Sequence, residues 1–143
     1  MVVLGTGIDL LDIRRIERTI DRFGDRFRER VYTPLERLHC SRRAKPAAAY
    51  AMRYAGKEAC AKALGTGFRA GIFWRDIEID SLPSGKPILR LTGGALTRLL
   101  RLTPPSMIAG IDISLSDEYP YAQAFVVISA HPSPAPGVAD GAP

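Results

Sequence analysis

The sequence has no long hydrophobic segment and few residues of the kinds that build zinc sites or disulfide scaffolds. Its 143 residues include two cysteines and two histidines, and they contain no run of 18 apolar residues. A membrane-spanning helix needs about 20 predominantly apolar residues, so we expect no membrane span. Cys40 and Cys60 lack CxxC spacing, which predicts two reduced thiols in a cytoplasmic protein rather than a disulfide or a zinc ligand pair.

The sequence also lacks the pattern of a nucleophilic catalyst. His39 adjoins a basic connector and His131 opens the C-terminal segment, while Ser114 and Ser116 have no histidine near them in the sequence. No Ser-His-Asp or Cys-His arrangement is therefore predicted.

Positive charge is concentrated in one part of the chain. Between residues 13 and 53 there are twelve lysines and arginines and five acids, which gives +7 in a chain whose net charge is +5. A localised positive face attracts anionic partners such as nucleic acid, a phosphate-bearing cofactor or an acidic protein. The same pattern is typical of a solvated helix face with Arg–Glu pairs, so charge alone leaves these alternatives open.

Hydrophobic periodicity and turn residues predict one α+β domain over residues 1–130, with a mostly antiparallel sheet and one long helix. Residues 131–143 are rich in proline, alanine and glycine, and we expect a disordered tail there. The expected strands are 2–10, 74–79, 88–91, 107–115 and 121–129. The expected helices are 13–22, 34–40, 45–64 and 92–102, with a short basic turn or helix at 25–31.

Several helix ends carry specific signals. Asp12 is placed to cap the helix that follows it. Thr33 is followed by proline and then by Glu36, which makes a capping box. Gly65 and Gly67 are expected to end the long helix.

The long helix carries an acid and a base on one face. Glu58 and Lys62 have the four-residue spacing of a surface ion pair worth about 0.3 to 0.5 kcal/mol, and spacing alone favours that reading. They are also the residue types of a phosphate and metal site, because Mg²⁺ prefers oxygen ligands and takes one or two carboxylates. Asp9, near the end of the first strand, is the candidate second carboxylate. Alanines along the helix would let another backbone come close.

Four short segments occur in a characteristic order. They are Gly7-Ile8-Asp9 followed by Arg14 to Ile16, the block RYAGKEACAKALGTG from Arg53 to Gly67, Ser84-Gly-Lys-Pro87, and Ser114-Leu-Ser-Asp-Glu118 before the last strand. In this order they resemble holo-[acyl-carrier-protein] synthase, the short bacterial type of 4′-phosphopantetheinyl transferase. The resemblance extends from about Val3 to Ser129.

The resemblance implies transfer of the phosphopantetheine arm of coenzyme A to a serine of acyl carrier protein, with release of adenosine 3′,5′-bisphosphate. It implies Mg²⁺ held by Asp9, Glu58 and the coenzyme's pyrophosphate, with Lys62 beside the phosphates to steady or protonate the leaving group. It also implies a homotrimer whose active sites lie at subunit interfaces, each completed by late strands of a neighbour. Such transfer needs positioning and charge neutralisation more than covalent chemistry, so Asp9, Glu58 and Lys62 are the expected catalytic residues.

The resemblance also suggests binding residues. The expected coenzyme contacts are Arg53, Lys62, Gly65, Lys86, Pro87, Asp112 and Ser114. The arginines of the first helix are expected to dock the acidic carrier protein, which replaces nucleic acid as the expected partner. Arg14 matches a carrier-protein contact of the family, and Arg15, Arg18 and Arg22 are inferred from their positions on the same helix.

At Asp112 the sequence departs from the pattern of the family. Many members have a histidine at this place, two residues before Ser114. An aspartate cannot donate as an imidazolium does, and it repels phosphate unless a metal or a lysine intervenes. If the serine needs a general base, Glu58 acting through a water on the metal is our first choice and Asp112 the second.

Two other functions would use the same residues. A non-catalytic basic module would bind an acidic protein or nucleic acid through its arginines, with a steep salt dependence for nucleic acid. A Mg²⁺ phosphohydrolase would use the same acids to cleave coenzyme A without a carrier protein.

Overall fold

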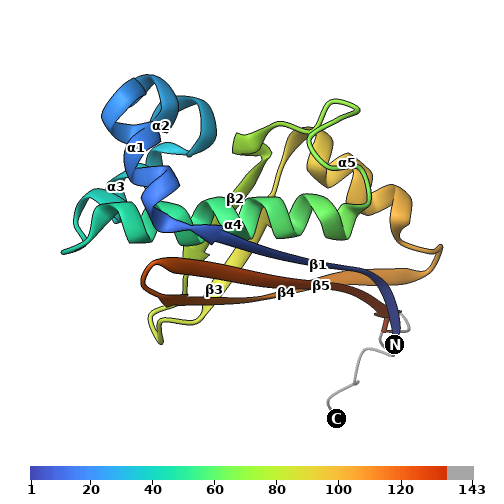
Figure 1. Ribbon diagram of the computed structural model, residues 1–143. Helices are drawn as coiled ribbons and strands as arrows, with labels where there is room; N and C mark the ends of the chain where they lie inside the picture. The colour runs from blue at the N-terminus through green and yellow to red at the C-terminus, as the bar shows by residue number, and fades with distance from the viewer. Residues whose placement is uncertain (135–143) are drawn as a thin grey trace, which may run out of the picture.

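The computed structural model describes residues 1–134, which form two antiparallel sheets and five α-helices (Figure 1). The strands are β1 (Val2–Asp12), β2 (Ile77–Ser81), β3 (Pro87–Leu91), β4 (Met107–Glu118) and β5 (Tyr121–Pro132). The helices are α1 (Ile13–Phe23), α2 (Asp25–Val31), α3 (Pro34–Ser41), α4 (Pro46–Leu64) and α5 (Gly93–Leu102), with a short 3₁₀ helix, η1, at Trp74–Asp76. The predicted α+β fold with one long helix is confirmed. No helix in this part of the chain is both long enough and apolar enough to cross a membrane.

Helix α4 packs across one face of the larger sheet, whose strand order is β1-β5-β4 (Figure 1). Every second residue of the central strand β5 from Ala122 to Ala130 is buried, and three of the five are alanines: Ala122, Ala124, Val126, Ile128 and Ala130. This period of two is that of a strand with one covered face. The core of the protein therefore lies between α4 and this sheet.

Two glycines let β1 approach α4 closely. A Cβ atom on Gly7 would lie 1.8 Å from the carbonyl oxygen of Ala59, and one on Gly5 would lie 2.1 Å from that of Ala63. The alanines of the long helix were expected to let another backbone come close, and Ala59 and Ala63 do so. Asp9 is two residues beyond Gly7, so it lies on the same side of the strand and faces α4.

Residues 74–76 form η1 rather than the start of a strand, which corrects the prediction. Asp76 Oδ2 accepts a hydrogen bond from the backbone N–H of Phe73 at 3.0 Å. The ring of Trp74 stacks on Phe68 with the ring centroids 3.8 Å apart. A side-chain cap and a stacked ring therefore hold this turn, and the strand begins only at Ile77.

Strands β1, β4 and β5 are longer than predicted. Strand β1 continues to Asp12, and β4 pairs with β5 along its whole length, from Met107 opposite Pro132 to Glu118 opposite Tyr121. His131 and Pro132 therefore belong to the last strand and not to the predicted tail. The greater part of the predicted tail, residues 135–143, lies outside the described residues.

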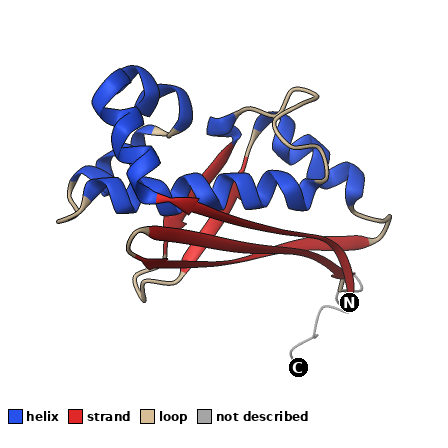
Figure 2. Cartoon of the chain, in the orientation of Figure 1, coloured by secondary structure: helices blue, strands red, loops and turns tan. Residues whose placement is uncertain are grey.

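The face of the larger sheet that points away from α4 is not covered by any other described element (Figure 2). Large apolar side chains on this outer face are between 44% and 62% exposed: Ile8, Leu10, Ile108, Tyr121 and Phe125. An exposed apolar surface of this kind indicates an interaction site.

Candidate active site

Asp9, Glu58 and Lys62 come together where β1 crosses α4, and we call them the acid–base group. Lys62 Nζ lies 3.2 Å from Asp9 Oδ1 and donates a hydrogen bond to the carbonyl oxygen of Ile8 at 2.8 Å. Lys62 therefore binds the strand, and a Glu58–Lys62 ion pair is absent from the described part of the chain. The prediction of a surface Glu58–Lys62 pair, which spacing alone favoured, is thus wrong.

The Glu58 carboxylate is partly buried and has no ion-pair partner within residues 1–134. Burial raises its pKa above the usual value, and the negative charge of Asp9 raises the pKa further, while Lys62 and Arg15 lower it. Of the two neighbouring carboxylates, Asp9 is paired with Lys62 and Glu58 is unpaired among the described residues. One negative charge is therefore left for a cation to neutralise.

The oxygen donors of the acid–base group fit Mg²⁺ better than a metal that takes all its ligands from the protein. Asp9 and Glu58 supply oxygen atoms only, and the described residues contain no group of three or more His, Cys, Asp or Glu side chains that could hold a metal. Zinc usually takes three or four protein ligands. Mg²⁺ bound with phosphates takes one or two carboxylates, so this pair leaves room for oxygen ligands from a substrate.

Tyr54 and Arg15 lie at the side of the acid–base group. The Tyr54 ring packs against Trp74 with centroids 4.8 Å apart, and the Arg15 guanidinium carbon lies 6.0 Å from the Tyr54 ring centroid. Burial and then the charge of Glu58 raise the pKa of the Tyr54 hydroxyl. Arg15, predicted as a docking residue, therefore places positive charge close to Glu58.

The four predicted docking arginines, Arg14, Arg15, Arg18 and Arg22, are all exposed on α1. The Arg14 side chain binds Asp12 through three hydrogen bonds: Nη2 to Oδ2 at 2.6 Å, Nε to Oδ1 at 2.9 Å and Nε to Oδ2 at 3.2 Å. This contact lowers the pKa of Asp12 to about 2. Asp12 also caps α1, as predicted, by accepting a hydrogen bond from the backbone N–H of Arg14. Part of the charge of Arg14 is therefore compensated within the chain.

Helix α4 ends at the predicted glycine turn, next to the acid–base group. Gly65 has φ of 81° and its N–H donates to the carbonyl oxygen of Lys62 at 3.0 Å. Arg98 of α5 donates from Nε to the carbonyl oxygen of Leu64 at 2.9 Å. A cation here offsets the negative end of the helix. Sequence reasoning missed Arg98 because nothing around it signals a contact with a distant helix end.

Comparison with known proteins decides the family. The family model described as "4′-phosphopantetheinyl transferase superfamily" matches residues 5–124. The chain belongs to this superfamily. A holo-[acyl-carrier-protein] synthase of Phenylobacterium zucineum is 58% identical over 139 residues, which cover 97% of this chain and 100% of that protein. One of Methylobacterium is 60% identical over 129 residues, which cover 90% and 96%.

Solved structures of the superfamily show the same fold. The holo-[acyl-carrier-protein] synthase of Neisseria meningitidis matches with a TM-score of 0.77 and 36% identity, over 90% of this chain and 99% of that one. The enzyme of Helicobacter pylori in complex with coenzyme A matches with a TM-score of 0.74 and 31% identity, over 87% and 99%. The resemblance inferred from the sequence is confirmed.

In this member of the superfamily, Asp112 and Ser114 do not face the acid–base group of their own chain. Both are exposed on β4, while Ile113 between them is buried on the side of α4. Asp9 is on that buried side of β1. One chain therefore presents the predicted metal ligands and the predicted Asp112 and Ser114 contacts on opposite faces of its sheet.

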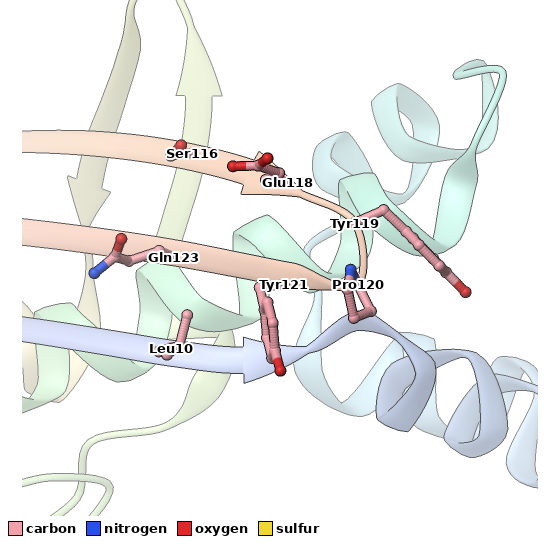
Figure 3. A pocket seen from close by; sticks show the side chains of 7 residues that line it. All are labelled: Leu10, Ser116, Glu118, Tyr119, Pro120, Tyr121 and Gln123. Atoms are coloured by element: carbon pink, nitrogen blue, oxygen red, sulfur yellow. The ribbon is translucent and has the colours of Figure 1, made fainter.

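A pocket of about 390 Å³ opens on the outer face of the larger sheet, close to the β4–β5 turn. In Figure 3 the side chains of Leu10, Tyr121 and Gln123 lie in front of the strands, with α4 behind them. Ser116 also lines this pocket, two residues beyond Ser114 and on the same side of β4. The outer face is thus hollowed near the β4–β5 turn, where Ser116 and Gln123 lie.

Three more of the predicted coenzyme contacts, Arg53, Lys86 and Pro87, are also separated from the acid–base group. Arg53 is only 4% exposed; its Nη1 donates to the carbonyl oxygen of Ala49 at 3.3 Å, and its Nε has no hydrogen-bond partner among the described atoms. Arg53 is about 140° around the helix from Glu58, so it points into the interior instead of lying beside Lys62. Lys86 and Pro87 lie at the β2–β3 turn, which is below the sheet in Figure 1, whereas α4 is above it.

A second charged pair, Glu36 and Lys57, lies inside the transferase fold. Both side chains are 0% exposed, and Lys57 Nζ lies 2.7 Å from Glu36 Oε1. Burial lowers the pKa of Lys57, and the charge of Glu36 opposes that shift. The predicted capping box of Thr33 and Glu36 is confirmed. The pairing with Lys57 was missed because the capping box already gave Glu36 a local role.

Proposed function

We propose that this protein transfers the 4′-phosphopantetheine arm of coenzyme A to a serine of apo acyl carrier protein and releases adenosine 3′,5′-bisphosphate. The observation that carries the proposal is the convergence of Asp9, Glu58 and Lys62 in a chain of this superfamily. Relatives that match the chain over almost their whole length are holo-[acyl-carrier-protein] synthases. The non-catalytic alternative rests on the arginines alone and explains neither the paired carboxylates nor these relatives.

In this proposal Asp9 and Glu58 hold Mg²⁺ together with the pyrophosphate of coenzyme A. The metal, when bound, offsets the negative charge of the phosphates and of the departing adenosine bisphosphate. The geometry that supports this is the oxygen-only donor pair and the uncompensated charge of Glu58. Both carboxylates are on rigid elements, β1 and α4, so they meet the metal without a loop having to move.

Lys62 is the residue proposed to meet the phosphates. Its ammonium is exposed and is held at Asp9 and the Ile8 carbonyl, next to the proposed metal position. As the serine oxygen forms its bond to phosphorus, the bond from phosphorus to the adenosine bisphosphate breaks, and negative charge builds on the leaving oxygen. An ammonium at this place stabilises that charge or donates a proton to it.

The serine nucleophile comes from the carrier protein, which α1 is proposed to dock through its exposed arginines. We expect that charge reversal at Arg18 raises the KM for carrier protein more than the KM for coenzyme A. Equal changes in both constants would argue against a docking role. For the serine proton, Glu58 is the proposed acceptor, through a water that the metal would hold, because its partly buried carboxylate has no ion-pair partner among the described residues.

A homotrimer with interfacial active sites is the proposed assembly. Asp112 and Ser114 face away from the acid–base group of their own chain, so a neighbouring copy would supply them, along with Lys86 and Pro87. The exposed apolar residues of the outer face support such packing. Sedimentation of the Leu10→Asp variant tests it: we expect smaller species and lost activity, and an unchanged mass with full activity would contradict the proposal.

A reducing cytoplasm is the proposed location. Cys40 and Cys60 are free and buried, and burial raises their pKa values to about 11 and about 12. Neither thiol is poised to react. Recovery of the protein in a secreted fraction would contradict this location.

The test of the proposed function is one incubation with apo carrier protein, coenzyme A and Mg²⁺, followed by intact mass spectrometry. Transfer appears as a carrier protein heavier by one phosphopantetheine group, dependent on Mg²⁺. Release of adenosine 3′,5′-bisphosphate without a mass change in the carrier would indicate a phosphohydrolase. Absence of both products would rule out the proposed reaction.

A further inference from the structure

The buried Lys57 ammonium has a complete set of acceptors. Its Nζ donates to Glu36 Oε1 at 2.7 Å, to the carbonyl oxygen of Trp74 at 3.0 Å and to that of Ile77. An ammonium has three donors, so each of them is used. The Lys57 side chain therefore has one orientation in which all its hydrogen bonds are made.

Glu36 is held as completely as its partner. Its Oε1 also accepts from the backbone N–H of Thr33 at 2.9 Å, and its Oε2 accepts from that of Ile79 at 3.0 Å. The pair thus connects α3, α4, η1 and β2. A side chain bound at both oxygens cannot turn without breaking a hydrogen bond inside the protein, which is costly.

Helix α4 is fixed on two sides at this level. A Cβ on Gly56 would lie 2.3 Å from Ile79 Cδ1, so the helix lies directly on β2. On another side the carbonyl oxygen of Ala59 meets Gly7 of β1. Lys57 lies between these two contacts along the chain, and its hydrogen bonds oppose rotation of the helix about its axis.

Glu58 follows Lys57 directly, and successive residues of a helix are about 100° apart. Fixing the direction of Lys57 therefore fixes the direction of Glu58, which has no partner of its own to hold it beside Asp9. We propose that Glu36 and Lys57 are positioning residues, which hold α4 in the rotation that points the Glu58 carboxylate at the cation position. This inference rests on the proposed function, because it gives Glu58 the role of a metal ligand.

A role limited to stability accounts for less of this arrangement. A buried ion pair is often no more stabilising than two apolar side chains of similar volume. What the pair adds is direction, since one hydrogen bond between the two side chains and four to backbone groups restrict orientation in a way that apolar contacts do not. Residues that orient a metal ligand from behind typically change metal affinity by about 10- to 100-fold when they are replaced.

The test measures metal binding rather than turnover. Mn²⁺ is titrated by calorimetry into the wild type, Lys57→Met and the double variant Glu36→Gln/Lys57→Met, all well below their unfolding temperatures. The double variant removes the buried unpaired carboxylate that would remain in Lys57→Met, so it keeps the test available if the single variant does not fold. We expect a Mn²⁺ dissociation constant about tenfold or more higher in every pair variant that folds.

Tyr32→Phe is the matched control. Tyr32 Oη donates to the carbonyl oxygen of Tyr50 at 2.8 Å, so this variant also removes a buried hydrogen bond to α4, but one far from Glu58 along the helix. Its Mn²⁺ dissociation constant should stay within about twofold of the wild type. In the transfer assay the pair variants should need more Mg²⁺ while the KM for carrier protein stays unchanged.

Two results would overturn the positioning role. One is wild-type Mn²⁺ affinity in the folded double variant; the other is an affinity loss in Tyr32→Phe as large as that of the pair variants. Glu58→Gln separates this inference from the function it rests on. If Glu58→Gln loses Mn²⁺ and the pair variants do not, only the positioning role fails; if Glu58→Gln binds Mn²⁺ and transfers normally, the metal assignment fails first.

Discussion

Lys57 and Glu58 are neighbours on α4, and the protein treats their charges in opposite ways. Lys57 is fully buried, and every hydrogen bond that its ammonium can make is made inside the chain. Glu58 is partly exposed, has no ion-pair partner in the described residues, and lies close enough to Asp9 to have its pKa raised. A satisfied charge holds elements together, whereas an unsatisfied one at the surface is free to bind a ligand.

The contrast also locates the cost of function. Keeping Glu58 ionised beside Asp9 opposes folding, because its carboxyl has a raised pKa in the folded state. The compensation is in the scaffold: the glycine contacts of β1 and the buried Glu36–Lys57 pair hold α4 in place. We therefore expect changes on the buried side to act on stability and on the position of Glu58, and changes on the open side to act on chemistry alone.

The largest expected effect on stability comes from breaking the buried pair. Glu36→Leu leaves the Lys57 ammonium buried without its carboxylate, which should lower the free energy of unfolding by about 3 to 5 kcal/mol. Urea denaturation measures the loss. The double variant Glu36→Leu/Lys57→Met should recover the part of the loss that is due to the buried charge, but not the part due to the hydrogen bonds that Glu36 accepts from Thr33 and Ile79. A single variant that loses less than about 1 kcal/mol would mean that Lys57 is not confined as described.

The next largest effect is expected at the contact that brings Asp9 to α4. Gly7→Ala places a methyl group 1.8 Å from the Ala59 carbonyl oxygen, so strand and helix must separate. We expect a loss of about 1 to 3 kcal/mol in unfolding free energy together with weaker metal binding. Gly110→Ala is the control, because its added Cβ would lie 3.8 Å from Ser129 Oγ, an ordinary contact. Equal stability in the two variants would contradict the close approach.

The smallest expected effect is at the exposed Asp12–Arg14 pair, which lies outside both groups. The pKa of the Asp12 carboxyl in the folded state is about 2, below its usual value of 3.8. The contribution of the pair to stability is therefore present above pH 3.8 and is lost as pH falls toward 2. Asparagine caps a helix as well as aspartate, so Asp12→Asn removes the ion pair alone. Unfolding midpoints of wild type and variant should differ slightly at neutral pH and converge at low pH. High salt should shrink the difference, since exposed pairs are screened.

Local signals predicted much of the fold. The Asp12 cap, the Thr33–Glu36 capping box and the Gly65 helix end depend on residues close together in the sequence, and the structure confirms all three. The predicted start of β2 at Trp74 was wrong. The apolar Trp74 ring stacks on Phe68 and does not belong to the alternating pattern of a strand. Such a contact depends on the path of the loop before it.

The candidate site was predictable in its residues but not in its geometry. The sequence singled out Glu58 and Lys62, yet helix spacing paired them with each other, and only the path of β1 shows that Lys62 binds Asp9. It was harder still to predict which basic side chains of α4 are buried. Arg53 and Lys57 are as polar as Lys62, and nothing in the alanine-rich helix shows which of its basic residues point inward.

The most direct test of the central claim is the transfer rate of Glu58→Gln, followed by intact mass at saturating coenzyme A and Mg²⁺, with an unfolding curve recorded on the same sample. The variant keeps the shape of the side chain and removes its charge. We predict a rate at least about 100-fold lower, with a free energy of unfolding equal to or slightly above that of the wild type. A variant that transfers phosphopantetheine at the wild-type rate would contradict the account.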